Sequence, residues 1–307
     1  MRVAISSRGP EDAFLAALRT LLPPTIELVV DEPGGADVLV KGVPNAVDLD
    51  EREGLRAVVI PYAGVPRVTR ELVAERPALT LHNLHHNAAP TAETAVALLL
   101  AAAKRVVPMD RALRARDWSL RYERSTDMLL EGSHALVLGY GAIGQRIGRA
   151  VEALGMRVTP VRRRDTVDLD TLLPTANAVL LALPLTPETD GMLDARRLAL
   201  LPDGCCIVNV GRGPLIDESA LYSELKSGRL RAGLDVWYQY PKSAEEAADT
   251  APATHDFGAL DSVVLSPHRA GHCLQIETLR AQHLAELLLA AANGQPIPNR
   301  VNLEAGY

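Results

Sequence analysis

Three glycines that follow a short apolar run constrain the fold of this chain more than any other feature. The run His134–Leu138 is typical of a buried strand, and Gly139, Gly141 and Gly144 follow it in a GxGxxG spacing before a helical segment. The first glycine permits a tight turn, the second lets a pyrophosphate approach the backbone, and the third lets helix and strand pack closely. Because a helix N-terminus also favours an anion, the pattern predicts a dinucleotide site, with a ligand-free turn as the alternative. The residues between the glycines belong to the predicted site: Tyr140, Ala142 and Ile143.

The residues about eighteen positions after Gly144 bear on the choice of cofactor, because a NAD site normally places Asp or Glu there for the ribose 2′-hydroxyl. Here the sequence has Arg162, Arg163 and Arg164. A guanidinium can form a bidentate pair with a 2′-phosphate, which a carboxylate would repel. The sequence therefore favours NADP(H), bound by Arg162 and Arg163, with NAD(H) as the alternative. A solvated charge run in which Asp165 pairs with one arginine is the competing interpretation.

Length and strand spacing predict two α/β domains. The 307 residues exceed what one hydrophobic core usually serves. Short apolar runs alternate with helical or turn-rich segments, which is typical of parallel, doubly wound sheets. The first series of expected strands is Arg2–Ile5, Ile26–Val30, Val38–Val40, Val58–Ile60 and Leu79–Leu81. The second series is His134–Leu138, Arg157–Val161, Ala178–Leu183, Cys206–Val210 and Ser262–Ser266.

Composition excludes several classes of partner. The net charge of −6 argues against nucleic acid, because phosphate backbones attract basic surfaces. The longest strongly apolar stretch, Ala95–Ala103, is about half of what crosses a bilayer, so no membrane span is expected. The first residues show no long apolar segment of a secretory signal, which makes the cytoplasm the expected location. The three cysteines are expected to be reduced, with Cys205 and Cys206 in a buried strand.

Four further motifs are Leu183–Thr189, Asn209–Gly213, Gly233–Trp237 and Leu265–Gly271, and all but Gly233–Trp237 lie at the end of an expected strand. With the glycine turn, their order resembles the D-isomer-specific 2-hydroxyacid dehydrogenases over nearly the whole chain. The resemblance implies a Rossmann cofactor domain, residues 99–284, inserted into a flavodoxin-like substrate domain, residues 1–98 and 285–307. It also implies an active site in the cleft between the domains and a homodimer formed through the cofactor domain.

The resemblance assigns roles to individual residues. Arg212 would hold the substrate carboxylate and polarise its carbonyl, since a planar cation matches a carboxylate with two hydrogen bonds. His268 would be the general acid, because histidine titrates near neutral pH. Asp235 resembles the family residue at the nicotinamide end of the cofactor. The other residues that the resemblance places near the cofactor are Pro184, Thr186, Thr189 and Val210.

Tyr240 departs from the family pattern. The family usually has a Glu just before a proline, and this Glu hydrogen-bonds the catalytic histidine; here Tyr240 precedes Pro241. Losing a carboxylate partner is expected to lower the pKa of His268 and to move reduction to lower pH. Tyr240 would then either orient the imidazole through its hydroxyl group or pack in the wall of the site, and we favour orientation.

The first domain also carries candidate substrate residues. Tyr62, Ala63 and Gly64 resemble the family loop whose backbone N–H groups receive the substrate carboxylate. His85 and His86 stand where the family usually has a Pro-Gly run, so they either recognise a polar substituent of the substrate or are surface residues of a turn. No Cys, Asp or third His lies at ligand spacing from this pair, so no metal is expected.

These features together predict an NADPH-preferring reductase of a small 2-keto acid, with glyoxylate or hydroxypyruvate as representative substrates. One alternative is oxidation of a small anion such as formate, suggested by the missing Glu. A second alternative is a dinucleotide-sensing binding protein of the same fold. The presence of both Arg212 and His268 favours the enzyme.

Overall fold

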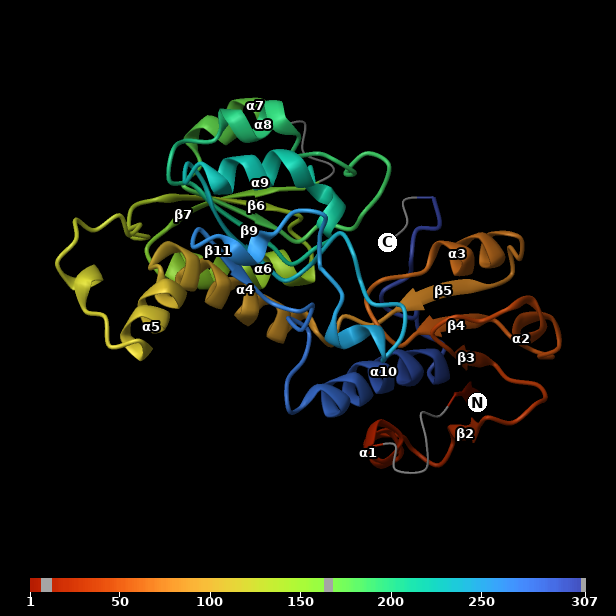
Figure 1. Cartoon of the computed structure of the whole chain (residues 1–307). Coiled ribbons are helices and arrows are strands. Elements are labelled where there is room, and N and C mark those ends of the chain that lie inside the picture. The colour runs from red at the N-terminus through yellow and green to blue at the C-terminus, as the bar shows by residue number, and fades with distance from the viewer. Residues whose placement is uncertain (7–12, 163–167, 305–307) are drawn as a thin grey trace. The chain divides into compact units, whose positions relative to one another are not determined.

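A computed structural model of the chain describes residues 1–6, 13–162 and 168–304. The candidate phosphate-binding residue Arg163 lies outside the described residues. The chain forms two compact units, Met1–Asn87 with His272–Tyr307, and Ala88–Gly271. Each unit contains one sheet with helices on both faces (Figure 1). The predicted fold class, two parallel α/β domains, is confirmed.

The first unit is built on a five-stranded parallel sheet of order β2-β1-β3-β4-β5, the flavodoxin-like order. Alternate residues of the strands face opposite sides, so Val38 and Val40 enter one core and Leu39 the other. The strands are β1 (Arg2–Ile5), β2 (Glu27–Val30), β3 (Val38–Val40), β4 (Ala57–Ile60) and β5 (Thr80–Asn83). Helices α1 (Ala13–Leu21) and α10 (Ile276–Ala292) cover one face, and α2 (Ala46–Asp50) and α3 (Arg67–Ala74) contribute to the other.

The second unit is built on a six-stranded parallel sheet of order β11-β10-β9-β8-β6-β7. Its strands are β6 (His134–Leu138), β7 (Arg157–Val161), β8 (Ala178–Leu181), β9 (Cys206–Asn209), β10 (Arg231–Leu234) and β11 (Val263–Leu265). Its α-helices are α4 (Ala88–Ala103), α5 (Val106–Arg114), α6 (Ala142–Ala153), α7 (Leu169–Leu172), α8 (Ala195–Leu200) and α9 (Glu218–Lys226). Short 3-10 helices span Ser119–Arg121, Leu173–Thr175, Gly213–Leu215, Glu246–Ala248 and Phe257–Ala259.

Helices bury the sheet of the second unit from both sides, which explains why its strands are continuous apolar runs. Helices α4 and α6 pack on one face, against side chains such as Val137 and Val208. Helices α8 and α9 pack on the other, against Leu136 and Ile207. The approach of α4 requires a glycine in β10, because a Cβ atom on Gly233 would lie 2.7 Å from the Cβ atom of Leu98.

The topology places the carboxyl end of β6 at a switch point. Strand β6 lies between β7 and β8. The chain therefore passes from β6 to β7 on one side and then crosses over to β8 on the other side. In open parallel sheets, ligands bind outside the carboxyl ends of the strands at such a point. The glycine turn Gly139–Gly144 follows β6 directly.

The division into units falls at the start of α4 and in the loop before α10, whereas the sequence analysis placed its domain boundaries at residues 98/99 and 284/285. Helix α4 lies wholly in the second unit, where it packs on α6, β9 and β10. Helix α10 lies wholly in the first unit, where it packs on α1. Each helix buries its apolar side against one sheet, so each belongs to one unit over its full length.

The predicted burial of two cysteines is confirmed. Cys206 begins β9, Cys205 precedes it, and both are buried. Burial raises the pKa of Cys206 to about 12, because the thiolate would lose its hydration. Among the described residues, no helix is long and apolar enough to cross a membrane.

Candidate active site

The glycine turn after β6 has the geometry that a dinucleotide requires. Gly139 adopts a φ of 90°, and a Cβ atom there would lie 2.7 Å from the carbonyl oxygen of Ala182. A Cβ atom on Gly144 would lie 1.9 Å from the carbonyl oxygen of Gly139, so this position cannot carry a side chain. A Cβ atom on Gly141, the N-cap residue of α6, would meet no described atom within 4 Å. The turn is therefore closed towards the protein and open at the helix N-terminus, which fits a pyrophosphate.

Arg162 follows β7 and lies beside the glycine turn. Its guanidinium carbon is 4.8 Å from the ring centroid of Tyr140, the residue between the first two glycines. β7 pairs with β6 in parallel register, with Leu138 opposite Val161, so the ends of the two strands are adjacent. Two predicted cofactor-binding residues, Tyr140 and Arg162, are thus neighbours in the folded unit.

Thr189 braces the loop that follows β8. Its hydroxyl group accepts a hydrogen bond from the backbone N–H of Thr186 at 2.8 Å and donates one to the carbonyl oxygen of Pro184 at 2.8 Å. Val210, at the end of β9, donates its N–H to the carbonyl oxygen of Leu181 at 3.1 Å. All four predicted residues of this region, Pro184, Thr186, Thr189 and Val210, lie at the carboxyl edge of the sheet.

Asn209 shapes the loop that carries Arg212. Its amide oxygen accepts from the N–H of Gly211 at 3.0 Å, and its amide nitrogen donates to the carbonyl oxygen of Arg212 at 2.8 Å. Asn209 is buried and Arg212 is exposed. The buried side-chain amide of Asn209 therefore holds the loop from which the Arg212 side chain is accessible to solvent. The sequence analysis did not select Asn209 as a site residue. A polar residue at the end of an apolar strand was the signal that could have indicated Asn209 as a site residue.

Asp235, at the end of β10, holds the loop that follows β11. Its buried carboxylate accepts hydrogen bonds from the N–H groups of Arg269 at 2.9 Å and Ala270 at 3.1 Å, and from the hydroxyl group of Ser266. These bonds enclose His268 between two anchored positions. Ser266 is the second positioning residue that the sequence analysis did not select.

His268 and Tyr240 pack against each other through their rings. The ring centroids are 5.4 Å apart, with an angle of 55° between the planes. His268 is exposed and adopts a φ of 55°, a left-handed conformation that is uncommon outside glycine and often marks functional positions. The hydroxyl group of Tyr240 accepts the backbone N–H of Trp237 at 3.0 Å, and partial burial raises the pKa of Tyr240. This backbone bond and the ring packing place the side chain of Tyr240 beside the imidazole of His268.

The sheet order places two predicted catalytic residues, Arg212 and His268, at the same edge as the predicted cofactor residue Asp235. β9, β10 and β11 are adjacent, and Arg212, Asp235 and His268 follow them in turn. The charges of Arg212 and Asp235 both act on the Tyr240 hydroxyl group, with opposite effects on its pKa. A cation, an imidazole and the glycine turn therefore share the carboxyl edge of one sheet, an arrangement suited to chemistry on an anionic substrate beside a dinucleotide.

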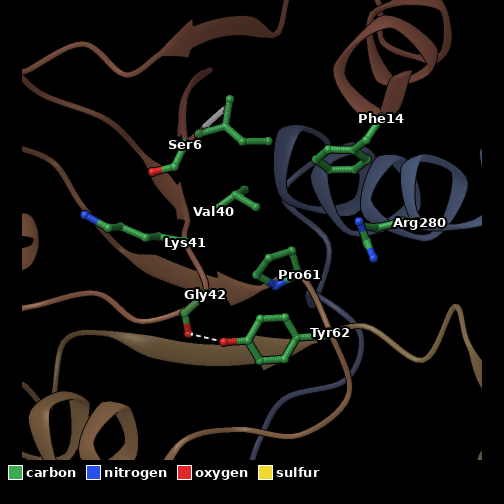
Figure 2. A pocket seen from close by; sticks show the side chains of 9 residues that line it. Ser6, Phe14, Val40, Lys41, Gly42, Pro61, Tyr62 and Arg280 are labelled. Carbon is green, nitrogen blue, oxygen red and sulfur yellow. Dashed lines mark hydrogen bonds between the residues drawn. The ribbon is translucent and has the colours of Figure 1, made fainter. Parts of the chain in front are cut away.

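The candidate substrate loop of the first unit follows β4. Tyr62 donates its hydroxyl group to the carbonyl oxygen of Gly42 at 2.8 Å (Figure 2). The carbonyl oxygen of Ala63 accepts the side-chain amide of Asn83 at 2.6 Å. These bonds fix Tyr62 and Ala63, and with them Gly64, at the carboxyl edge of this sheet. A cavity of about 190 Å³ lies beside Tyr62.

The two histidines after β5 differ in environment. His86 is buried, and its Nε2 atom accepts a hydrogen bond from Nε of Arg280 at 3.3 Å; His85 is half-buried. Arg280 also pairs with Glu277 and lies 5.8 Å from the ring centroid of Phe14, which it faces in Figure 2. His86 therefore supports an interior arginine of the first unit. Among the described residues, no group of three or more His, Cys, Asp or Glu side chains could hold a metal ion.

Comparisons with known proteins agree with this arrangement. Residues 96–270 match the NAD binding domain of D-isomer specific 2-hydroxyacid dehydrogenases. The chain is 30% identical to a glyoxylate reductase from Korarchaeum cryptofilum, over 92% of this chain and 87% of that protein. It is also 30% identical to a glycerate dehydrogenase from Methylorubrum extorquens, over 89% and 88%. It spans about half the length of the D-3-phosphoglycerate dehydrogenases that it also matches.

A solved D-isomer specific 2-hydroxyacid dehydrogenase from Xanthobacter autotrophicus Py2, in complex with NADPH and MES, has the same fold. The TM-score is 0.80 at 24% identity, and the match covers 100% of this chain and 99% of that one. The fold, the site and the sequence matches define a nicotinamide-dependent oxidoreductase. The chain belongs to the D-isomer specific 2-hydroxyacid dehydrogenase family.

Replacing Asp235 tests its part in holding the His268 loop. Asp235→Asn puts an amide N–H among backbone N–H donors and should lower the free energy of unfolding by about 1.5–3 kcal/mol. Urea unfolding measures the loss. Asp261→Asn is the control, since the side chain of Asp261 is 62% exposed, and it should change stability by less than about 0.5 kcal/mol. Equal unfolding midpoints for both variants would contradict the anchoring role of Asp235.

Proposed function

We propose that the chain catalyses NADPH-dependent reduction of a small 2-keto acid to the D-2-hydroxy acid. The observation that carries the proposal is the grouping of Arg212, Asp235 and His268 after three adjacent strands, in the unit that also holds the glycine turn. The names of two relatives, a glyoxylate reductase and a glycerate dehydrogenase, support glyoxylate and hydroxypyruvate as representative substrates.

Each group has a chemical task in this reaction. The turn Gly139–Gly144 would hold the pyrophosphate of the cofactor, which supplies the hydride when it is bound. The guanidinium of Arg212 binds the substrate carboxylate and polarises the keto oxygen. Nε2 or Nδ1 of His268 donates a proton to that oxygen and takes it back in the reverse direction. Ala63 and Gly64 are proposed as substrate-binding residues on the resemblance of their loop alone.

The preference for NADPH rests on Arg162. It stands after β7, where a NAD site normally has an acidic residue, and its positive charge suits a 2′-phosphate. Arg163 is proposed, on the sequence alone, to take part in binding the 2′-phosphate. NADH remains the alternative cofactor, and the comparison of the two belongs in the first experiment.

The first experiment measures NADPH and NADH consumption with a panel of 2-keto acids, and reduction of NADP⁺ and NAD⁺ with formate. NADPH-dependent turnover of a keto acid is expected. Turnover of formate alone would favour the small-anion alternative. Tight cofactor binding without any turnover would favour a sensor.

Replacing His268 tests the general acid. His268→Ala should lower the rate of keto-acid reduction roughly 100- to 10,000-fold, because no other group is assigned to protonate the keto oxygen, while NADPH affinity stays the same. His283→Ala, on α10, is the control and should keep full activity. A rate for His268→Ala equal to that of the unaltered protein would remove the assignment.

Replacing Tyr240 tests its placement beside the imidazole. In Tyr240→Glu, a carboxylate favours the charged imidazolium and raises the pKa of His268. The acid needed for reduction then persists to higher pH, so the alkaline limb of the pH–rate profile should move upward. Tyr240→Phe keeps the ring without adding charge and should not move that limb upward. An unchanged profile for Tyr240→Glu would count against this placement.

We also propose a homodimer that uses the segment around α5. Every residue of α5 is at least partly exposed, and the segment presents large apolar side chains, which mark interaction surfaces. These side chains are Val106, Met109, Leu113, Trp118, Tyr122 and Leu129. Figure 1 shows α5 and the chain after it extending away from the sheet of the second unit.

Sedimentation velocity tests the dimer. The unaltered protein should sediment at twice the 33.0 kDa chain mass. Leu113→Asp with Trp118→Asp should give monomers, because burying two carboxylates in an apolar interface is costly. Val68→Asp changes an exposed apolar residue of α3 and should leave the dimer intact. A monomeric unaltered protein at micromolar concentration would overturn the proposal.

A further inference from the structure

We propose that Tyr140 is a positioning residue for the cofactor's 2′-phosphate: its ring holds Arg162 beside the glycine turn, and Gly148 provides the space for that ring. The inference rests on the NADPH preference proposed above and adds a specificity determinant to it. The ligand class is an adenosine that carries a phosphate on the ribose 2′-oxygen.

The ring of Tyr140 lies directly on the backbone of α6. A Cβ atom on Gly148 would lie 2.6 Å from the hydroxyl oxygen of Tyr140 and 2.8 Å from Cε2. No alanine fits at position 148 without displacing this ring. Glycine is otherwise unfavourable in the interior of a helix. The close approach of the Tyr140 ring explains why a glycine stands at position 148 of α6.

Tyr140 also contacts Arg162. The guanidinium carbon lies 4.8 Å from the ring centroid, within the range of a cation–π interaction. Gly148, Tyr140 and Arg162 thus form a chain of contacts that runs from the backbone of α6 through the aromatic ring to the guanidinium. We call these three residues the Tyr140 stack.

The Tyr140 stack restricts the long side chain of Arg162. A long arginine loses rotamer freedom when it binds a ligand, and holding it beforehand reduces that loss. The backbone of Tyr140 belongs to the turn between Gly139 and Gly141, and its ring lies against Gly148. The arginine is therefore held at the carboxyl end of β7, where the ribose of a dinucleotide lies in folds of this type.

Binding of 2′,5′-ADP and of 5′-AMP tests the inference by isothermal titration calorimetry on the full chain. The two probes differ in the 2′-phosphate and lack the nicotinamide, so the readout is independent of turnover. The ratio of their dissociation constants measures recognition of the 2′-phosphate. In the unaltered protein, 2′,5′-ADP should bind the more tightly.

Tyr140→Leu removes the aromatic face and should weaken 2′,5′-ADP about two- to fivefold, leaving 5′-AMP unchanged. Tyr140→Phe keeps the face and should retain the ratio of the unaltered protein. Gly148→Ala displaces the ring and should behave like Tyr140→Leu. Glu152→Ala, an exposed position on the same helix, should change neither probe.

A double-mutant cycle separates positioning from a general structural effect. In an Arg162→Ala background, Tyr140→Leu should produce no further loss of 2′,5′-ADP affinity, because the group that it positions is gone. Equal weakening of both probes by Tyr140→Leu would indicate damage to the turn and overturn the inference. An unchanged ratio in Tyr140→Leu would overturn it while leaving the NADPH preference in place. Equal binding of both probes by the unaltered protein would overturn both.

Discussion

The parallel alignment of every paired strand in the second unit is the constraint on which its chemistry depends. Parallel strands with helical crossovers send all carboxyl ends to one edge of the sheet, and helices cover both faces. Because helices cover both faces, the polar groups of the loops reach solvent and ligands only at the ends of the strands. The glycine turn, Arg212 and His268 share an edge because their strands run in the same direction, although more than one hundred residues separate the first from the last.

The loops of the candidate active site are held by hydrogen bonds to side chains that lie at strand ends or within the loops themselves. Thr189 closes the loop after β8, Asn209 the loop after β9, and Asp235 the loop after β11. Each bond ties a backbone group that would otherwise face water. The exposed residues Arg212 and His268 thus project from loops whose backbones are fixed, which is the condition for charge stabilisation without reorganisation.

The sequence predicted the fold class and the family because both follow from local patterns. Apolar runs mark the strands, and the glycine spacing marks the strand–turn–helix junction after β6. Helix boundaries were harder: the domain limits of the sequence analysis divided α4 and α10, since a helical pattern does not reveal which sheet covers it. The contact of His86 with Arg280 joins residues far apart in the chain and left no local signal.

The sequence by itself indicated the strands other than β10, the dinucleotide motif, the replacement of an acid by Arg162 and the substitution of Tyr240 for the family's Glu. The tertiary structure decided what those residues touch: Asp235 anchors the His268 loop, Tyr240 packs on the imidazole, and the ring of Tyr140 contacts both Gly148 and Arg162. Spacing along the chain records local conformation, whereas contacts between distant side chains form only when the sheet brings the ends of its strands together.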